Sequence, residues 1–116
     1  MQGGPANETS ELVGTPGYMA PEQCVGGTID AKTDIYALGC VLWEALVGRP
    51  MISTRSTLDT LRHQVSIQPI SPARLRSDIP DTLSALILRA VEKDPQLRFP
   101  NVVAMETQLR LIRNGL

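Results

Sequence analysis

The most distinctive chemistry in the sequence lies in one short run, Gly14 to Glu22, which reads Gly-Thr-Pro-Gly-Tyr-Met-Ala-Pro-Glu. Two prolines and two glycines within it predict an ordered loop or a very short helix. The run ends in a carboxylate, Glu22, after a proline in an apolar stretch. A buried carboxylate is very costly unless a cation pairs with it, and the planar guanidinium of arginine can hold both of its oxygens.

Two further charged residues stand beside signals for helix ends. Asp34 opens a long apolar segment, where a carboxylate in the first turn favours the free backbone N–H groups. Arg98 follows Asp94-Pro95, a dipeptide that ends a helix. On their own, Glu22 and Arg98 could also be two unrelated surface charges.

The order of these motifs resembles that of protein kinases. Gly14 to Glu22 is similar to the end of the kinase activation segment, which closes in Ala-Pro-Glu. The phrase from Ile29 to Gly39, and Gly48-Arg49-Pro50 after it, look most like bacterial serine/threonine kinases. The resemblance covers residues 9–112 and implies the helical C-terminal lobe of the kinase fold, with residues 1–22 as the end of the activation segment.

The resemblance also implies structural roles. It makes Ala20, Pro21 and Glu22 the closing motif, with Glu22 in a buried ion pair to Arg98. It implies that Asp34 accepts backbone N–H groups from a catalytic loop. Gly39 costs roughly 1 kcal/mol inside a helix compared with alanine, which suggests that another backbone approaches closely there.

On the substrate side, the resemblance points to four consecutive residues. Thr15 would lie beside the catalytic base and argues for serine/threonine specificity, with Pro16, Gly17 and Tyr18 completing the substrate-side loop. The simpler interpretation of Thr15 is a turn-forming residue before proline. Thr9 and Ser10 lie where such kinases receive activating phosphates, although a plain solvated loop would also account for them.

The groups that transfer phosphate do not occur in these residues. The sequence has no Gly-x-Gly-x-x-Gly, no His-Arg-Asp and no Asp-Phe-Gly. We therefore expect no catalytic residue, cofactor site or metal ligand in this chain, and no activity from it alone. A complete kinase domain would need ATP, Mg²⁺, an upstream N-terminal part and a protein substrate. The alternative is a non-catalytic binding module derived from a kinase, or a truncated gene remnant.

Composition narrows the kinds of partner and location that the chain can have. A net charge of −1 and 3% aromatic residues give no sign of a nucleic-acid partner. The longest apolar run, Ile35 to Val47, is too short to span a bilayer and contains Glu44, so no membrane segment is expected. Cys24 and Cys40 fit no metal or redox spacing, which favours a cytoplasmic location.

Hydrophobic periodicity predicts an all-α chain with long ordered loops. A central helix capped by Thr33 should cover residues 33–47, ending at Gly48. A weaker helix is expected at 56–66, followed by an extended connector over 66–80. Amphipathic helices should follow at 81–93 and 102–113, the second capped by Asn101.

The central helix is apolar on nearly every face, which is typical of a buried helix. The helices at 81–93 and 102–113 can cover only part of it. We therefore expect an exposed apolar patch on one side, around Tyr36, Cys40, Val41 and Trp43, and a tendency of the isolated chain to self-associate.

Overall fold

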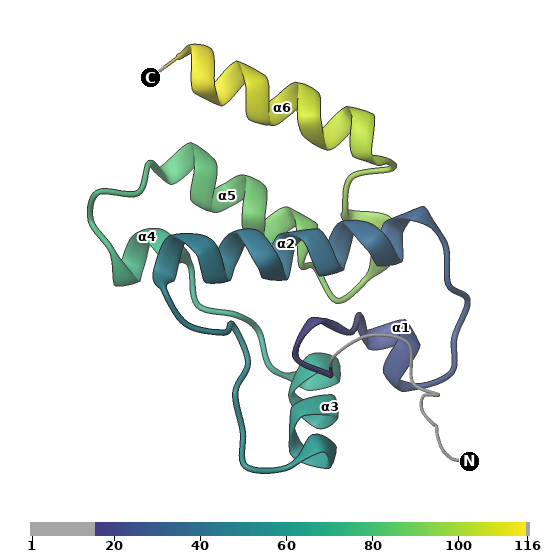
Figure 1. The fold of residues 1–116 in the computed structure, drawn as a ribbon. Coiled ribbons are helices and arrows are strands. Elements are labelled where there is room, and N and C mark those ends of the chain that lie inside the picture. Colours follow the sequence, from purple (N-terminus) through teal and green to yellow (C-terminus); the bar gives the residue numbers. More distant parts are fainter. Residues whose placement is uncertain (1–15, 116) are drawn as a thin grey trace.

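The computed structural model describes residues 16–115, and every regular element in that range is a helix. This confirms the all-α prediction. Figure 1 shows α2, α5 and α6 stacked in layers, while α1 and α3 lie side by side on the other side of α2. The elements in chain order are η1 Pro16–Tyr18, α1 Pro21–Cys24, α2 Ala31–Val47, α3 Thr57–Ser66, α4 Pro72–Leu75, α5 Asp81–Ala90, η2 Pro95–Leu97 and α6 Val102–Asn114.

Helix α2 begins two residues before the predicted start at 33, because Asp30 caps it and Thr33 does not. The Asp30 carboxylate accepts the backbone N–H of Lys32 at 2.9 Å, and the Thr33 hydroxyl accepts the N–H of Asp30 at 3.2 Å. This reciprocal arrangement satisfies donors that the first turn leaves free. At the other end Gly48 adopts a left-handed φ of 93°, so the helix stops where the sequence indicated.

The predicted exposed face of α2 is right for Val41 and wrong for its other three members. Tyr36, Cys40 and Trp43 are buried, and the exposed apolar side chains are Val41 and Leu38, which are 51% and 38% accessible. The three buried residues are covered by chain segments that lie far away in the sequence. Ala20 and Val91 pack against Tyr36 and Cys40. Trp43 joins the main core and donates its indole N–H to the carbonyl of Ile70 at 2.8 Å.

The main core lies between α2, α5 and α6. Ile35 and Trp43 of α2 meet the apolar stripe of α5, and Phe99 and Met105 close the cluster from the chain that follows. The α5 residues in this core are Leu86, Ile87 and Ala90. The stripe predicted for this helix therefore faces the interior.

Two predicted helix ends change in the C-terminal half, and the predicted connector contains a short helix. Helix α5 ends at Ala90, not at Lys93, and the carbonyls of Glu92 and Lys93 accept hydrogen bonds from Arg98 instead of continuing the helix. The connector over 66–80 contains the short helix α4, which periodicity cannot detect in four residues. Helix α6 runs one residue beyond the predicted 113 and is capped as expected, with Asn101 accepting the N–H of Ala104 at 2.9 Å.

Helix α3 reverses the usual relation between polarity and burial. Its start matches the prediction within one residue, with Ser56 as the cap. Its apolar residues Leu58 and Val65 are 56% and 41% exposed, whereas the polar residues Thr60 and Gln64 are buried. Figure 1 shows this helix standing apart from the layers, against the segment that contains η1 and α1.

Within residues 16–115, none of the helices is both long enough and apolar enough to cross a bilayer.

Candidate functional site

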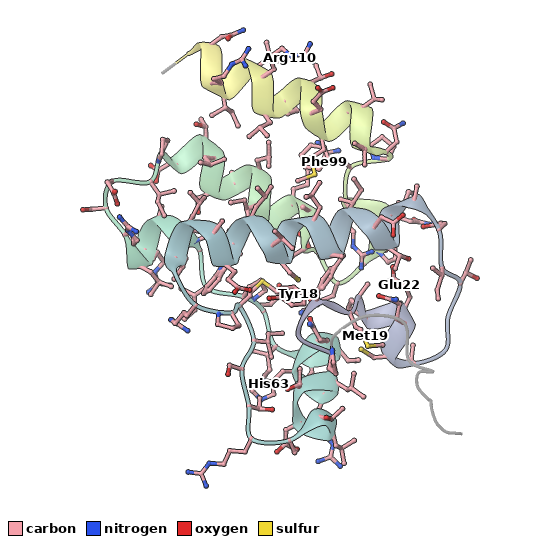
Figure 2. The ribbon with its side chains drawn as sticks, viewed as in Figure 1. Tyr18, Met19, Glu22, His63, Phe99 and Arg110 are labelled. Atoms are coloured by element: carbon pink, nitrogen blue, oxygen red, sulfur yellow. The ribbon has the colours of Figure 1, made fainter. Side chains whose placement is uncertain are left out.

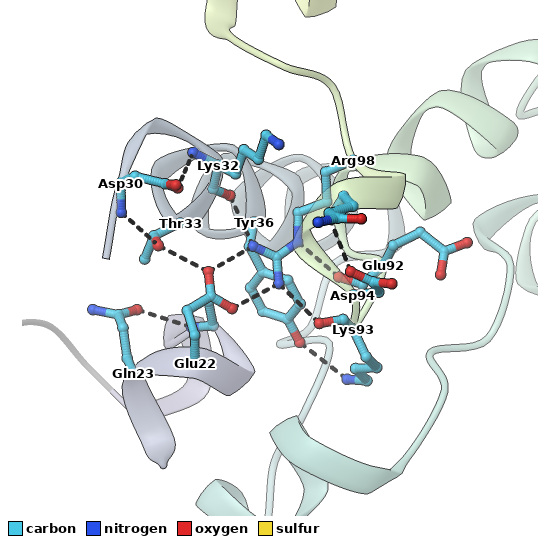
Figure 3. A network of polar contacts seen from close by, with 12 residues as sticks. Glu22, Gln23, Asp30, Lys32, Thr33, Tyr36, Glu92, Lys93, Asp94 and Arg98 are labelled. Carbon is cyan, nitrogen blue, oxygen red and sulfur yellow. Dashed lines mark hydrogen bonds and ion pairs between the residues drawn. The ribbon is translucent and has the colours of Figure 1, made fainter. Parts of the chain in front are cut away.

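The centre of the candidate site is an ion pair between Glu22 of α1 and Arg98, which follows η2. The guanidinium holds the carboxylate in a fork, with Nη1 at 2.7 Å from Oε2 and Nη2 at 2.9 Å from Oε1. The Arg98 side chain is fully buried. Figure 3 shows how the pair joins α1 to the base of the helical layers. The ion pair that the resemblance implied is therefore present in the structure.

Arg98 has no unused hydrogen-bond donor. Besides the two bonds to Glu22, its Nη1 donates to the carbonyl of Lys32 at 2.9 Å and its Nη2 to that of Lys93 at 3.3 Å. Its Nε donates to the carbonyl of Glu92 at 2.7 Å. A guanidinium carries five N–H groups, so every donor finds an acceptor. This full satisfaction is what allows a charged side chain to be buried.

Glu22 is held from a second side as well. The hydroxyl of Thr33 donates to Oε2 at 2.8 Å, which ties the carboxylate to the first turn of α2. Burial acts to raise the pKa of Glu22, but hydrogen bonds from Arg98, the backbone and Thr33 outweigh it and lower that pKa. Glu22 is therefore ionised in the folded protein and acts as a structural anion.

Tyr36 lies beneath this pair and extends the polar network. The Arg98 guanidinium carbon stands 4.9 Å from the centre of its ring, and Lys93 donates to its hydroxyl at 3.1 Å (Figure 3). Burial raises the pKa of Tyr36, so its hydroxyl stays protonated and can donate onward. Burial also lowers the pKa of Lys93 to about 8.

The described part of the predicted substrate-side loop is η1, and two side-chain hydrogen bonds hold it. Tyr18 donates from its hydroxyl to the carboxylate of Glu44 on α2. Gln64 of α3 donates to the carbonyl of Pro16 at 3.1 Å. Sequence reasoning did not identify Gln64 or Glu44, because a single polar residue within a helix carries no signal of its partner. Figure 2 places Tyr18 and Met19 in the segment between α2 and α3.

The remaining candidate residues differ in whether they contact this site. Ala20 and Pro21 are buried beside Glu22. Asp34 is exposed on α2, on the same side as Leu38 and Val41, and does not contact the ion pair. Gly39 faces α5: a Cβ added there would lie 2.7 Å from Val91 Cγ1 and 2.8 Å from Ala90 Cβ. The close approach at Gly39 thus involves the side chains of Ala90 and Val91, at the end of α5, more than the backbone. Thr9, Ser10 and Thr15 lie outside the described residues.

The protein kinase domain family matches this chain over residues 2–109. The chain belongs to the protein kinase family. It is 34% identical over 113 residues to the serine/threonine-protein kinase PknB of Mycolicibacterium smegmatis. This match covers 97% of this chain and 18% of PknB. It is also 36% identical over 100 residues to the serine/threonine-protein kinase PksC of Streptomyces coelicolor. This match covers 86% of this chain and 18% of PksC. PknB of Mycobacterium tuberculosis matches with the same 34% identity over 113 residues.

Two conclusions follow from membership of the protein kinase family. The resemblance drawn from the motifs is confirmed over nearly the whole chain. The chain also spans about 18% of the length of these curated relatives, so it corresponds to one part of a longer architecture.

Proposed function

We propose that this chain is the C-terminal part of a serine/threonine protein kinase domain, in which it supplies the substrate-side loop and the helical base that holds it. The observation that carries the proposal is the buried ion pair between Glu22 and Arg98. It fixes the segment that follows η1 to a core made by α2, α5 and α6. A loop that must present a protein hydroxyl to a reacting phosphate needs such a rigid support.

The proposal divides the work of phosphoryl transfer between this chain and residues outside it. Thr15, Pro16, Gly17 and Tyr18 contact the protein substrate around its serine or threonine. ATP and Mg²⁺ supply the phosphoryl group and neutralise its charge, and the groups that hold them belong to an N-terminal part of the domain. Asp34, exposed beside Leu38 and Val41, faces that part. The two cysteines, both free thiols, favour a cytoplasmic location.

The proposal also covers regulation by phosphate. Thr9 and Ser10 receive phosphates that order the segment before the substrate-side loop by pairing with an arginine of the N-terminal part. Mass spectrometry of the full-length protein after incubation with ATP should locate phosphate on one of these two residues. Phosphate found only elsewhere would remove this part of the proposal.

The test of the main proposal compares two preparations. The full-length protein encoded by the gene should transfer phosphate from Mg·ATP to serine or threonine in a peptide library, and the purified 116-residue chain should neither bind Mg·ATP nor transfer phosphate. Mock preparations from cells without the gene control for contaminating kinases. A full-length protein with no transfer would overturn the proposal in favour of a non-catalytic binding module. Transfer by the short chain would contradict the division of work.

A further inference from the structure

A partly buried chain of hydrogen bonds runs from the C-terminal end of the core to the substrate-side loop. Lys93 donates to the hydroxyl of Tyr36 at 3.1 Å, that hydroxyl donates to Oε1 of Gln64, and Nε2 of Gln64 donates to the carbonyl of Pro16 at 3.1 Å. Gln64 is the last side chain in this sequence of bonds, and it is 0% exposed.

The orientation of the Gln64 amide follows from its partners. The carbonyl of Pro16 can only accept, so the group facing it must be the NH₂ of the amide. The amide oxygen then accepts from Tyr36, whose hydroxyl already receives a bond from Lys93. Each of these three bonds thus pairs one donor with one acceptor, and a buried amide held through both its nitrogen and its oxygen has one preferred orientation.

The bond from Gln64 reaches the loop at Pro16, the first residue of η1. Helix η1 is a single turn, closed by the N–H of Met19, which donates to the same Pro16 carbonyl at 3.3 Å. Tyr18 is fixed separately, through Glu44 of α2. Gln64 is thus the contact through which α3 sets the position of the first residue of η1.

We propose that Gln64 is a positioning residue for substrate binding: it fixes the Pro16 backbone from α3 and thereby sets the affinity of the kinase for its peptide substrate. The role of the loop in this inference rests on the proposed function, whereas the hydrogen bonds from Lys93 to Pro16 are observed independently of it. A change at Gln64 should act on peptide binding and leave nucleotide binding unchanged, because these bonds end at Pro16 of the substrate-side loop and the proposed function assigns the nucleotide-binding groups to the N-terminal part.

The decisive variant is Gln64→Glu in the full-length protein. A carboxylate keeps the acceptor for Tyr36, but it cannot donate to Pro16 and places a charge against that carbonyl. Because Gln64 is buried, this charge also lowers the thermal midpoint whatever its effect on peptide binding. We expect the KM for a peptide selected from the library to rise about fivefold, the effect of losing one net hydrogen bond. The kcat and the KM for ATP should stay within about twofold of wild type.

Two further variants separate positioning from a general loss of stability. Gln64→His should restore most of the peptide affinity, since a neutral imidazole offers one N–H donor and one acceptor nitrogen. Gln68→Glu makes the same chemical change at an exposed glutamine four residues later and should leave all parameters unchanged.

Hydrogen exchange gives a readout that does not depend on activity. In Gln64→Glu the amide of Met19 should exchange faster than in wild type, while the amide of Gly48, bonded to Glu44 O at 2.8 Å, should keep its rate. Unchanged Met19 exchange, or equal relative changes in kcat and both KM values, would overturn the inference. If wild-type protein transfers no phosphate, the proposed function fails, and the Met19 rate alone decides whether Gln64 holds the loop.

Discussion

Helices α5 and α3 are both ten residues long and both carry an apolar stripe, but only α5 buries it. In α5 the buried residues include Leu86, Ile87 and Ala90. In α3 the buried residues are Thr60 and Gln64, and the apolar stripe lines an open groove together with Cys24 and Val25. The two helices therefore dock by different physical means.

The difference lies in what each helix meets. Helix α5 packs on the apolar side of α2, so burial of hydrocarbon stabilises the contact. Helix α3 meets polar groups of the preceding chain, a hydroxyl and a backbone carbonyl, and polar side chains that bond to them are stabilised there. Thr60 shares a hydrogen bond of 2.7 Å with Thr54, and Gln64 bonds to Pro16. A buried polar group with partners on both sides carries little penalty.

The largest effect should come from breaking the ion pair that joins the loop region to the core. Arg98→Ala and Glu22→Ala should each lower the free energy of unfolding by about 3–5 kcal/mol, because each leaves a buried charge without its partner. Urea denaturation of the single and double variants measures this. The double variant should cost clearly less than the sum of the singles, and simple additivity would show that the residues do not interact.

Truncating one leucine in each helix tests the comparison directly. Leu86→Ala in α5 should cost about 2–5 kcal/mol, since Leu86 is buried in the main core. Leu58→Ala in α3 should change the stability by no more than about 0.5 kcal/mol, because the side chain is mostly exposed. Equal losses would mean that the apolar face of α3 is covered in solution.

Gly39→Ala should lower stability by about 1–3 kcal/mol, although alanine favours helix formation more than glycine does. The added methyl group would collide with Val91 and Ala90 at the α2–α5 contact. Adding Val91→Ala should recover part of the loss, because it removes the nearer atom. A stabilising effect of Gly39→Ala alone would show that the two helices can move apart easily.

The smallest effect is expected from protonating Glu22. Its pKa is lower in the folded protein than its ordinary value of 4.5, so below that value the unfolded chain binds more protons than the folded one. The contribution of ionised Glu22 to the free energy of unfolding is complete above pH 4.5 and is lost as the pH falls through the lower pKa of the folded protein. The difference in unfolding free energy between wild type and Glu22→Gln should shrink in that acidic range. A constant difference from pH 7 to pH 3 would contradict the assigned direction.

Local chemistry allowed several features to be predicted from the sequence. The helix ends at Gly48 and Asn101 depend on residues beside them, and both predicted positions agree with the structure. The start of α2 was placed two residues late, since Asp30 and Thr33 can both cap and only their reciprocal bonds decide between them. The Glu22–Arg98 pair was expected only through the resemblance to kinases, because its members stand 76 residues apart.

The sequence by itself determined that this protein is helical, where most of its helices begin or end, and that its motifs follow the order found in kinases. The tertiary structure alone decided which faces are buried. Tyr36, Cys40 and Trp43 are interior because the segments around Ala20, Ile70 and Val91 cover them. Gln64 is interior because Pro16, 48 residues earlier, offers it a carbonyl. The physical reason is that helix formation and capping depend on neighbours in the chain, whereas the cost of burying a side chain depends on partners that only folding brings near it.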